Sequence, residues 1–293
     1  GATIELINKN KLTDLEPNAY SPSGRGLWSP YTSVVNPKEV ILQLEKELKE
    51  NGVIFLKNQL IEKISLKEKK IYTRSNDCYK YKYFFNCAGL QSDKIAHLCD
   101  VGKEFSILPF KGLYWKLKNN KKYKIKTNIY PVPDLSVPFL GVHFTPNADI
   151  SPNIYIGPTA TFALGRENYK LFKSIEPLMS ISNLFTLSKQ YLLNKNKFRR
   201  YVHDQSLQAF KPFLLKAAKK LVPSLESNEI EISDKAGIRA QLYNKNEMKL
   251  VEDFIYINSI DSTHVLNAVS PAFTSSFSLA DLIINSSKVK NSL

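Results

Sequence analysis

The chain has 293 residues, a length that buries a sizeable core as one large domain or as two interleaved ones. Its formal net charge is +14, but the excess is nearly all lysine; because base readers rely on arginine, and no aromatic-basic ladder is present, the composition argues against nucleic-acid binding. No apolar run approaches the ~18–20 residues of a membrane span, and the first residues lack the order of a signal peptide.

The first third of the chain predicts a loop, a helix and several short strands. Residues 12–37 are loop-rich, because prolines punctuate a run of Ser, Gly and Asn. Residues 38–51 have the spacing of an amphipathic helix, which Asn36-Pro37 opens and Asn51-Gly52 closes. Strands are predicted at 53–57, 61–66, 69–74 and 79–86, and a helical segment follows at 92–98.

The rest of the chain predicts an antiparallel sheet, a helical region and a return to strand. The sheet is expected to use strands at 106–117, 124–132, 139–145 and 153–157. Residues 169–221 have helical periodicity, which Pro212 interrupts; within them Lys216–Lys220 forms a basic face, interpreted as solvated surface with membrane-surface binding as the alternative. Strands are then predicted at 237–243 and 248–257, and a closing helix at 270–285.

Four blocks of sequence resemble, in order, the L-2-hydroxyglutarate oxidase/dehydrogenase family, which are FAD enzymes of the D-amino-acid-oxidase superfamily. The blocks are NCAGLQSDKIA (86–96), PFKGLYW (109–115), YPVPDLSVPFLGVHFTPNADISPNIYIGP (130–158), and GIRAQ through HVLNAVSPAFTSS (237–276). The resemblance extends from about Leu12 to Ile284. It implies FAD as cofactor and oxidation of an L-2-hydroxy acid, expected to be L-2-hydroxyglutarate, to the 2-oxo acid by hydride transfer to flavin N5. Oxygen or a quinone would be the electron acceptor.

The resemblance also implies an α/β fold of mixed α+β character. In it, the remnant of a Rossmann-like FAD-binding domain is interleaved with an antiparallel-sheet substrate domain. The expected division is 1–30 leading into the substrate domain, 31–104 in the FAD domain, 105–236 as substrate domain and 237–293 returning to the FAD domain. The family's first strand–GxGxxG–helix unit has no counterpart, because Gly24-Arg25-Gly26 lies in a proline-rich loop. We therefore expect the first βαβ unit to be absent and the chain to be a fragment, with a split gene as the alternative.

Two segments are candidates for binding the cofactor. Ala88-Gly89 lies where a strand turns into a helix, and small residues there let backbone N–H groups approach a phosphate or ribose; a plain turn is the alternative. Ser270-Pro271 is a helix start signal, and free N–H groups at a helix start favour negative charge; an ordinary capped helix is the alternative. The resemblance implies that this second segment faces the flavin O2/N1 locus, with contacts from Asn267, Ser270, Pro271, Ala272, Thr274 and Ser275.

Three residues are candidates for binding the substrate. Arg239 lies in a strand of small and apolar residues and needs an anion there, because burying an unpaired guanidinium is costly. Its planar fork matches a carboxylate, and the resemblance assigns it the substrate α-carboxylate; a structural salt bridge is the alternative. Lys111 stands where the family usually has arginine, so it keeps the charge but loses the bidentate fork. Tyr114 follows on the same strand and is expected to line the pocket.

Histidines are the candidates for the catalytic base, because imidazole takes up a proton near neutral pH. His143 ends the apolar run FLGVH within a family-like block, with a hydrogen-bonded core histidine as the alternative. His264 precedes the closing helix and is the second candidate. Arg166, in LGRENY, matches a basic residue common in the family and has no assigned role.

The remaining expectations concern metals, location and rival functions. Cys78, Cys87 and Cys99 fit neither a zinc site nor a CxxC pair, so we expect reduced thiols, no metal and a cytoplasmic location, with peripheral contact at the inner membrane left open. The alternative functions are an amino-acid or amine oxidase of the glycine-oxidase type and a non-catalytic basic fragment.

Overall fold

The fold is described from a computed structural model, in which residues 3–118, 125–132, 141–148, 153–170, 173–194 and 198–289 are described. The chain forms two compact units that alternate along the sequence. The first unit comprises residues 1–54, 111–162 and 191–237, and the second comprises residues 55–110, 163–190 and 238–293. This division is structural and does not say which unit binds a cofactor, so the functional boundaries expected from the sequence stay a prediction.

The first unit begins with a small antiparallel pair and a long helix. Strands β1 (Glu5–Asn8) and β2 (Arg25–Trp28) pair with each other, and helix α1 (Lys9–Leu15) lies between them in the chain. Most of residues 12–37 is irregular, as expected of a loop-rich stretch, although α1 ends at Leu15 and β2 is a short strand within it. The predicted helix is confirmed as α2 (Pro37–Glu50), and the Asn36 side chain accepts a hydrogen bond from the N–H of Lys38 as its N-cap.

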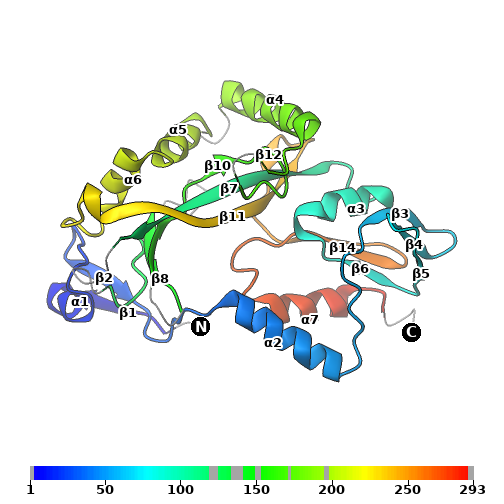
Figure 1. Cartoon of the computed structure of the whole chain (residues 1–293), viewed down its shortest axis with the longest axis horizontal. Coiled ribbons are helices and arrows are strands. Elements are labelled where there is room, and N and C mark those ends of the chain that lie inside the picture. Colours follow the sequence, from blue (N-terminus) through cyan, green and yellow to red (C-terminus); the bar gives the residue numbers. More distant parts are fainter. Residues whose placement is uncertain are drawn as a thin grey trace. The chain divides into compact units, whose positions relative to one another are not determined.

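A six-stranded sheet supplies strands to the core of the first unit. The strand order is β12-β11-β7-β9-β8, with β10 (Thr161–Phe162) paired to β7. The other strands are β7 (Phe105–Leu117), β8 (His143–Pro146), β9 (Ile154–Gly157), β11 (Ile230–Asn244) and β12 (Lys249–Leu250). Helices α5 (Phe198–Gln208) and α6 (Lys211–Ala218) run beside β11 (Figure 1). Buried Phe144, Ile156 and Leu214 join strands and α6 in one apolar cluster.

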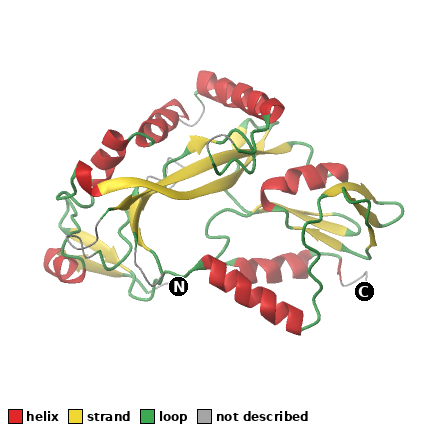
Figure 2. Cartoon of the chain, in the orientation of Figure 1, coloured by secondary structure: helices red, strands yellow, loops and turns green. Residues whose placement is uncertain are grey.

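The second unit contains two three-stranded sheets and helices. Strands β3 (Ile61–Ser65), β4 (Lys70–Thr73) and β5 (Cys78–Lys80) form an antiparallel meander. A separate sheet has the order β13-β14-β6, from β13 (Ile255–Asn258), β14 (Ser262–Asn267) and β6 (Phe84–Asn86), and its β6 and β14 are parallel (Figure 2). Helix α3 (Ser92–Leu98) contacts β14, β6 and β3. A buried cluster that includes Ala96, Ile107 and Leu266 is the core of this unit.

Several strand predictions are wrong for identifiable reasons. Residues 53–57 are irregular, because the N–H of Val53 bonds back to Leu48 at the end of α2 rather than to a neighbouring strand. The continuous strand predicted at 79–86 is two strands, because β5 pairs with β4 whereas β6 leaves the meander to pair with β14. The strand predicted at 248–257 is likewise two strands, β12 and β13.

The two strands predicted between 124 and 145 are only partly present. Residues 125–132 are irregular apart from a single bridge between Ile129 and Phe144, and Pro131 cannot donate a ladder hydrogen bond. The second strand begins at His143, and residues 124, 139 and 140 lie outside the described ranges.

The predicted helical regions are present, with two differences from the prediction. The region 169–221 contains α4 (Pro177–Leu193), α5 and α6, and Pro212 lies in the first turn of α6 instead of interrupting a helix, since a first-turn residue needs no N–H partner. The closing helix is α7 (Ser276–Ser286), so it begins after Ser270-Pro271 rather than at it. Among the described residues, no helix combines the length and the apolar character needed to cross a bilayer.

Candidate cofactor and substrate sites

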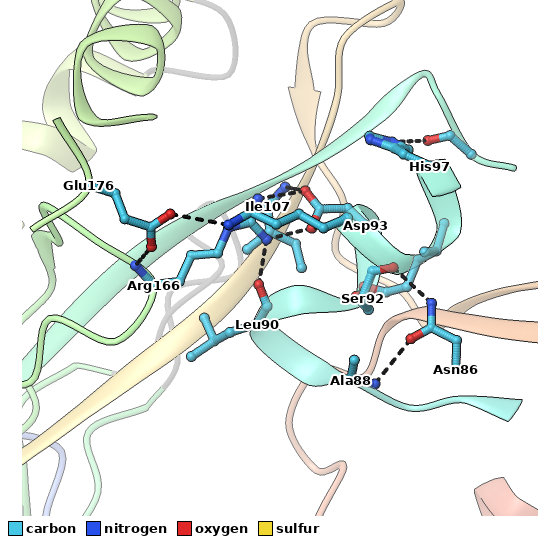
Figure 3. A network of polar contacts seen from close by, with 12 residues as sticks. Asn86, Ala88, Leu90, Ser92, Asp93, His97, Ile107, Arg166 and Glu176 are labelled. Carbon is cyan, nitrogen blue, oxygen red and sulfur yellow. Dashed lines mark hydrogen bonds and ion pairs between the residues drawn. The ribbon is translucent and has the colours of Figure 1, made fainter. Parts of the chain in front are cut away.

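The turn after β6 is held by hydrogen bonds of a buried side chain, and its own residues are exposed to solvent. The buried Asn86 side chain accepts a hydrogen bond from the N–H of Ala88 at 3.2 Å and donates one to the carbonyl of Ser92 at 2.8 Å (Figure 3). Gly89 has a φ of +53°, which favours glycine, and a Cβ placed there would meet no atom within 4 Å. Ala88 and Gly89 are exposed. A rigid, exposed turn of small residues fits the phosphate or ribose of a dinucleotide.

His264 lies on the neighbouring strand and is fully buried. Its Nδ1 is 3.2 Å from Nδ2 of Asn86, and its Nε2 is 3.0 Å from the hydroxyl of Ser262. An amide nitrogen only donates, so Nδ1 carries the lone pair and Nε2 donates its proton to Ser262. Burial lowers the pKa of His264 to about 4. A neutral imidazole with both nitrogens bonded is suited to joining β14 to β6, which favours a structural role over that of a base.

The last residue of β14 is held to the loop before β13 by side-chain hydrogen bonds, and a local backbone hydrogen bond closes the segment after it. Asn267 is buried, and its Nδ2 donates to the carbonyls of Asp253 at 2.6 Å and Val251 at 3.3 Å. The N–H of Ala272 donates to the carbonyl of Val269 at 2.8 Å. The amide nitrogen of Asn267 is therefore used in hydrogen bonds within the protein, and a cofactor contact from this residue stays a prediction.

Residues 270–275 form a turn ahead of α7. The carbonyl of Pro271 accepts hydrogen bonds from the hydroxyls of Thr274 and Ser275, each at 3.0 Å. It also accepts the N–H of Ser275 at 3.0 Å. Ser270 and Pro271 are exposed. The inference that Ser270-Pro271 supplies free N–H groups at a helix start is therefore wrong, because the helix starts at Ser276 and this turn precedes it.

In the first unit, His143 begins β8 and is 8% exposed. Its Nδ1 lies 2.9 Å from the carbonyl of Gly141, and its ring lies 4.4 Å from the ring of Tyr130 at 31°. A carbonyl only accepts, so Nδ1 carries the proton and Nε2 keeps the lone pair. Burial lowers the pKa of His143; the bond to Gly141 opposes this, and the charge of Lys235 adds to it. The imidazole is thus neutral near pH 7, with Nε2 as its basic atom.

A lysine and two tyrosines lie near His143 in the same unit. Nζ of Lys235 is 5.0 Å from the ring centroid of Tyr114 and 4.5 Å from that of Tyr155, within the range of cation–π attraction. Burial, and then the nearby Tyr130, raise the pKa of Tyr114, so its hydroxyl keeps its proton. The sequence interpretation missed Lys235. A signal was present, because Lys235 lies an even number of residues from Arg239 on one strand.

The two remaining candidate residues lie in different units. Lys111, on β7 in the first unit, is 7% exposed, and burial lowers its pKa. The carbonyl of Lys111 accepts a hydrogen bond from the hydroxyl of Thr161 at 3.2 Å. Arg239 lies on β11 in the second unit and is half-buried. Within single units, the structure thus brings together His143 with Tyr114, and Ala88 with His264 through Asn86.

Comparison with known proteins identifies the family. A family model described as FAD dependent oxidoreductase matches residues 1–285. The chain belongs to the FAD-dependent oxidoreductase family. This confirms the family and mixed α/β fold class expected from the sequence motifs, and FAD as the family's cofactor.

Three relatives of this FAD-dependent oxidoreductase are described as L-2-hydroxyglutarate dehydrogenases. "L-2-hydroxyglutarate dehydrogenase, mitochondrial" from Caenorhabditis elegans is 34% identical over 291 residues, covering 96% of this chain and 65% of the relative. The protein of the same description from Bos taurus is 34% identical, covering 96% and 63%. "L-2-hydroxyglutarate dehydrogenase" from Indibacter alkaliphilus is 31% identical, covering 94% and 68%. The chain thus spans about two thirds of the length of the relatives it matches.

Solved structures show the same fold at lower identity. L-alpha-glycerophosphate oxidase from Mycoplasma pneumoniae, dithionite-reduced and with FAD bound, matches with a TM-score of 0.64 at 20% identity, covering 96% of this chain and 63% of that one. Glycine oxidase from Bacillus cereus matches with a TM-score of 0.59 at 15% identity, covering 98% and 67%.

Among the described residues, no group of three or more His, Cys, Asp or Glu side chains is placed to hold a metal ion.

Proposed function

We propose that this protein is a FAD-dependent oxidoreductase that oxidises L-2-hydroxyglutarate to 2-oxoglutarate. The observation that carries the proposal is the match to proteins described as L-2-hydroxyglutarate dehydrogenase, at 31–34% identity across 94–96% of the chain, from a nematode, a mammal and a bacterium. The net charge of +14 supports it, since a positive field attracts a substrate that carries two carboxylates.

The oxidation removes a hydride from C2 of the substrate and a proton from its 2-hydroxyl. FAD supplies the hydride acceptor when it is bound. His143 is assigned the role of the base that accepts the hydroxyl proton, because its Nε2 holds a lone pair while its Nδ1 is hydrogen-bonded to the carbonyl of Gly141. The lowered pKa of His143 keeps that lone pair available in neutral solution.

Positive and polar side chains are assigned to the carboxylates and the pocket wall. Arg239 is proposed to hold the α-carboxylate, because its guanidinium can make two parallel hydrogen bonds to one carboxylate. Lys111 and Tyr114 are proposed to line the pocket. The buried ammonium of Lys111, whose pKa is lowered, can supply one charge but not a bidentate contact.

Cofactor contacts are proposed for the two turns of the second unit. The exposed backbone at Ala88 and Gly89 is assigned to a phosphate or ribose of FAD. The segment containing Asn267, Ser270, Pro271, Ala272, Thr274 and Ser275 is assigned to the flavin end. The electron acceptor, oxygen or a quinone, and a cytoplasmic location with peripheral contact at the inner membrane, belong to the same proposal.

Anaerobic flavin reduction tests this function in the full-length protein. Adding L-2-hydroxyglutarate should bleach the flavin absorbance and yield 2-oxoglutarate, whereas the D enantiomer and glycine should not. Bleaching by glycine in place of the hydroxy acid would favour an amine oxidase of the glycine-oxidase type. A colourless protein that binds no added FAD would overturn the proposal.

A further inference from the structure

Arg166 and Asp93 form a buried ion pair in the second unit, behind the turn assigned to the cofactor (Figure 3). Nη2 of Arg166 lies 2.9 Å from Oδ2 of Asp93, and Nη1 lies 2.5 Å from Oδ1. The two side chains are 6% and 3% exposed. The pair joins the loop after β10 to the first turn of α3, segments that are 73 residues apart in the chain.

The same two side chains also hold main-chain groups. Nη1 of Arg166 donates to the carbonyl of Leu90, which lies in the turn between Gly89 and α3. The carboxylate of Asp93 accepts the N–H of Ile107, in β7, at 2.9 Å and the N–H of Lys94 at 2.8 Å. Burial alone would raise the pKa of Asp93, but the hydrogen bonds and charge of Arg166, with these two N–H groups, lower it. Asp93 is therefore ionised at neutral pH.

A second acidic residue fixes the loop that carries Arg166. One oxygen of Glu176 accepts the main-chain N–H of Arg166 at 2.9 Å, and the other lies 3.2 Å from Nζ of Lys94. Charges of alternating sign thus face each other across the two segments, with Asp93 and Lys94 on α3 and Arg166 and Glu176 opposite. This pairing holds Arg166 by both its backbone and its side chain.

An ion pair as buried as this one is a poor source of net stability, because desolvation of the two charges offsets most of their attraction. The ion pair does fix the positions of the main-chain groups that it binds. The cofactor turn has two anchors, Asn86 at its start and Arg166 at Leu90, and the exposed Cys87–Gly89 backbone lies between them. Each anchor restrains the turn without covering its open side.

We propose that Arg166 and Asp93 are positioning residues for the FAD-binding turn, an inference that rests on the proposed function. They touch no cofactor atom themselves. They hold the Leu90 carbonyl, and through it the backbone at Gly89, in the conformation that binds a phosphate or ribose. A loosened turn has to be ordered when FAD binds, and that ordering lowers affinity.

The test separates turn geometry from folding. Arg166→Met alone leaves the Asp93 carboxylate buried and unpaired, which destabilises strongly. The double variant Asp93→Asn/Arg166→Met carries no charge at either position. Its amide oxygen can still accept the N–H of Ile107, but the hydrogen bond to the Leu90 carbonyl is lost. Arg166→Lys is the conservative variant, with one charge and no fork. Arg74→Met is the matched control, since it removes the exposed pair with Glu62 in the same unit.

FAD is titrated into the apo form of each full-length variant, and the unfolding midpoint is measured without FAD. The double variant should bind FAD ~10–100-fold more weakly with an apo midpoint close to the parent, comparable to losing an outer partner of a bound group. Arg166→Lys should weaken FAD binding in the same direction, and it decides the matter if the double variant does not fold. Arg74→Met should bind FAD as the parent does.

Parent-like FAD affinity in Arg166→Lys and in a folded double variant would overturn the positioning role. An equal loss in Arg74→Met would overturn it too. A parent that binds no FAD would overturn the proposed function together with this inference. A parent that binds FAD but oxidises no hydroxy acid would remove only the proposed substrate.

Discussion

Asn86 and His264 are register partners on the parallel strands β6 and β14, and Nδ2 of Asn86 lies 3.2 Å from Nδ1 of His264. The Asn86 amide donates one proton to His264 and one to the Ser92 carbonyl, while its oxygen accepts the N–H of Ala88. A protonated His264 would oppose this arrangement, because Nδ1 would then need an acceptor. The geometry of the exposed turn at Ala88 and Gly89 therefore goes together with a neutral, buried imidazole at His264.

The first prediction follows from the pKa of His264, about 4 in the folded protein against 6.5 ordinarily. Well above pH 6.5 neither state binds the proton, so His264 adds no pH dependence there. As pH falls from 6.5 to about 4 the unfolded state binds it and the folded state does not, so the free energy of unfolding decreases by at most ~3 kcal/mol. Urea unfolding across this window should show the decrease.

His264→Gln removes that titration, so its unfolding free energy should depend less on pH between 6.5 and 4. His203→Gln, which changes an exposed histidine, should keep the dependence of the parent because His264 is still present. A His264→Gln variant with the full dependence of the parent would show that other groups cause it.

Local signals in the sequence were enough for elements whose ends are set by neighbours in the chain. The cap at Asn36 and Pro37 predicts α2 to within a residue or two, because the N-cap bond is made three residues apart or less. Strand boundaries were less predictable when the partner is distant. The break between β5 and β6 arises because β6 pairs with β14, which lies far downstream in the sequence. Residues 79–86 alone therefore do not predict the break.

The candidate site follows the same rule. Blocks around His143 and Ala88 predicted the family, but Arg166 had no assigned role, because its partner Asp93 lies 73 residues away and the pair forms only in the fold. The helix start at Ser270-Pro271 was wrong for a related reason. Bonds to the Pro271 carbonyl close a turn there, and α7 begins at Ser276.

A second prediction concerns Arg239 as the carboxylate anchor. In the full-length protein, Arg239→Lys should raise KM and lower kcat/KM for L-2-hydroxyglutarate by ~10–10³-fold, the loss of one charge-assisted bidentate contact at ~1.5–4 kcal/mol. Steady-state kinetics measure the change. Arg74→Lys, at an exposed pair with Glu62, is the control and should leave kcat/KM as it was. An unchanged kcat/KM in Arg239→Lys would assign Arg239 to structure.

A third prediction concerns FAD binding by the 293-residue chain expressed on its own. The sequence contains no GxGxxG, the motif whose helix N-terminus receives the pyrophosphate of a dinucleotide. FAD titration should therefore show much weaker binding than in the full-length protein, and the purified chain should be nearly colourless. A yellow chain with one flavin per molecule would contradict this.

The last prediction concerns His143 as the catalytic base. In the full-length protein, His143→Asn should lower kcat by ~10²–10⁴-fold while FAD content stays normal, because the amide cannot take the hydroxyl proton. The pH profile gives a second readout: kcat/KM should fall as pH decreases through the pKa of His143, which burial places below 6.5, so activity should persist to below that pH. His264→Asn is the comparison, and it should disturb FAD binding or the flavin spectrum through Asn86 rather than the reduction step. Stopped-flow flavin reduction separates the two, and loss of reduction in His264→Asn alone, with flavin retained, would exchange their roles.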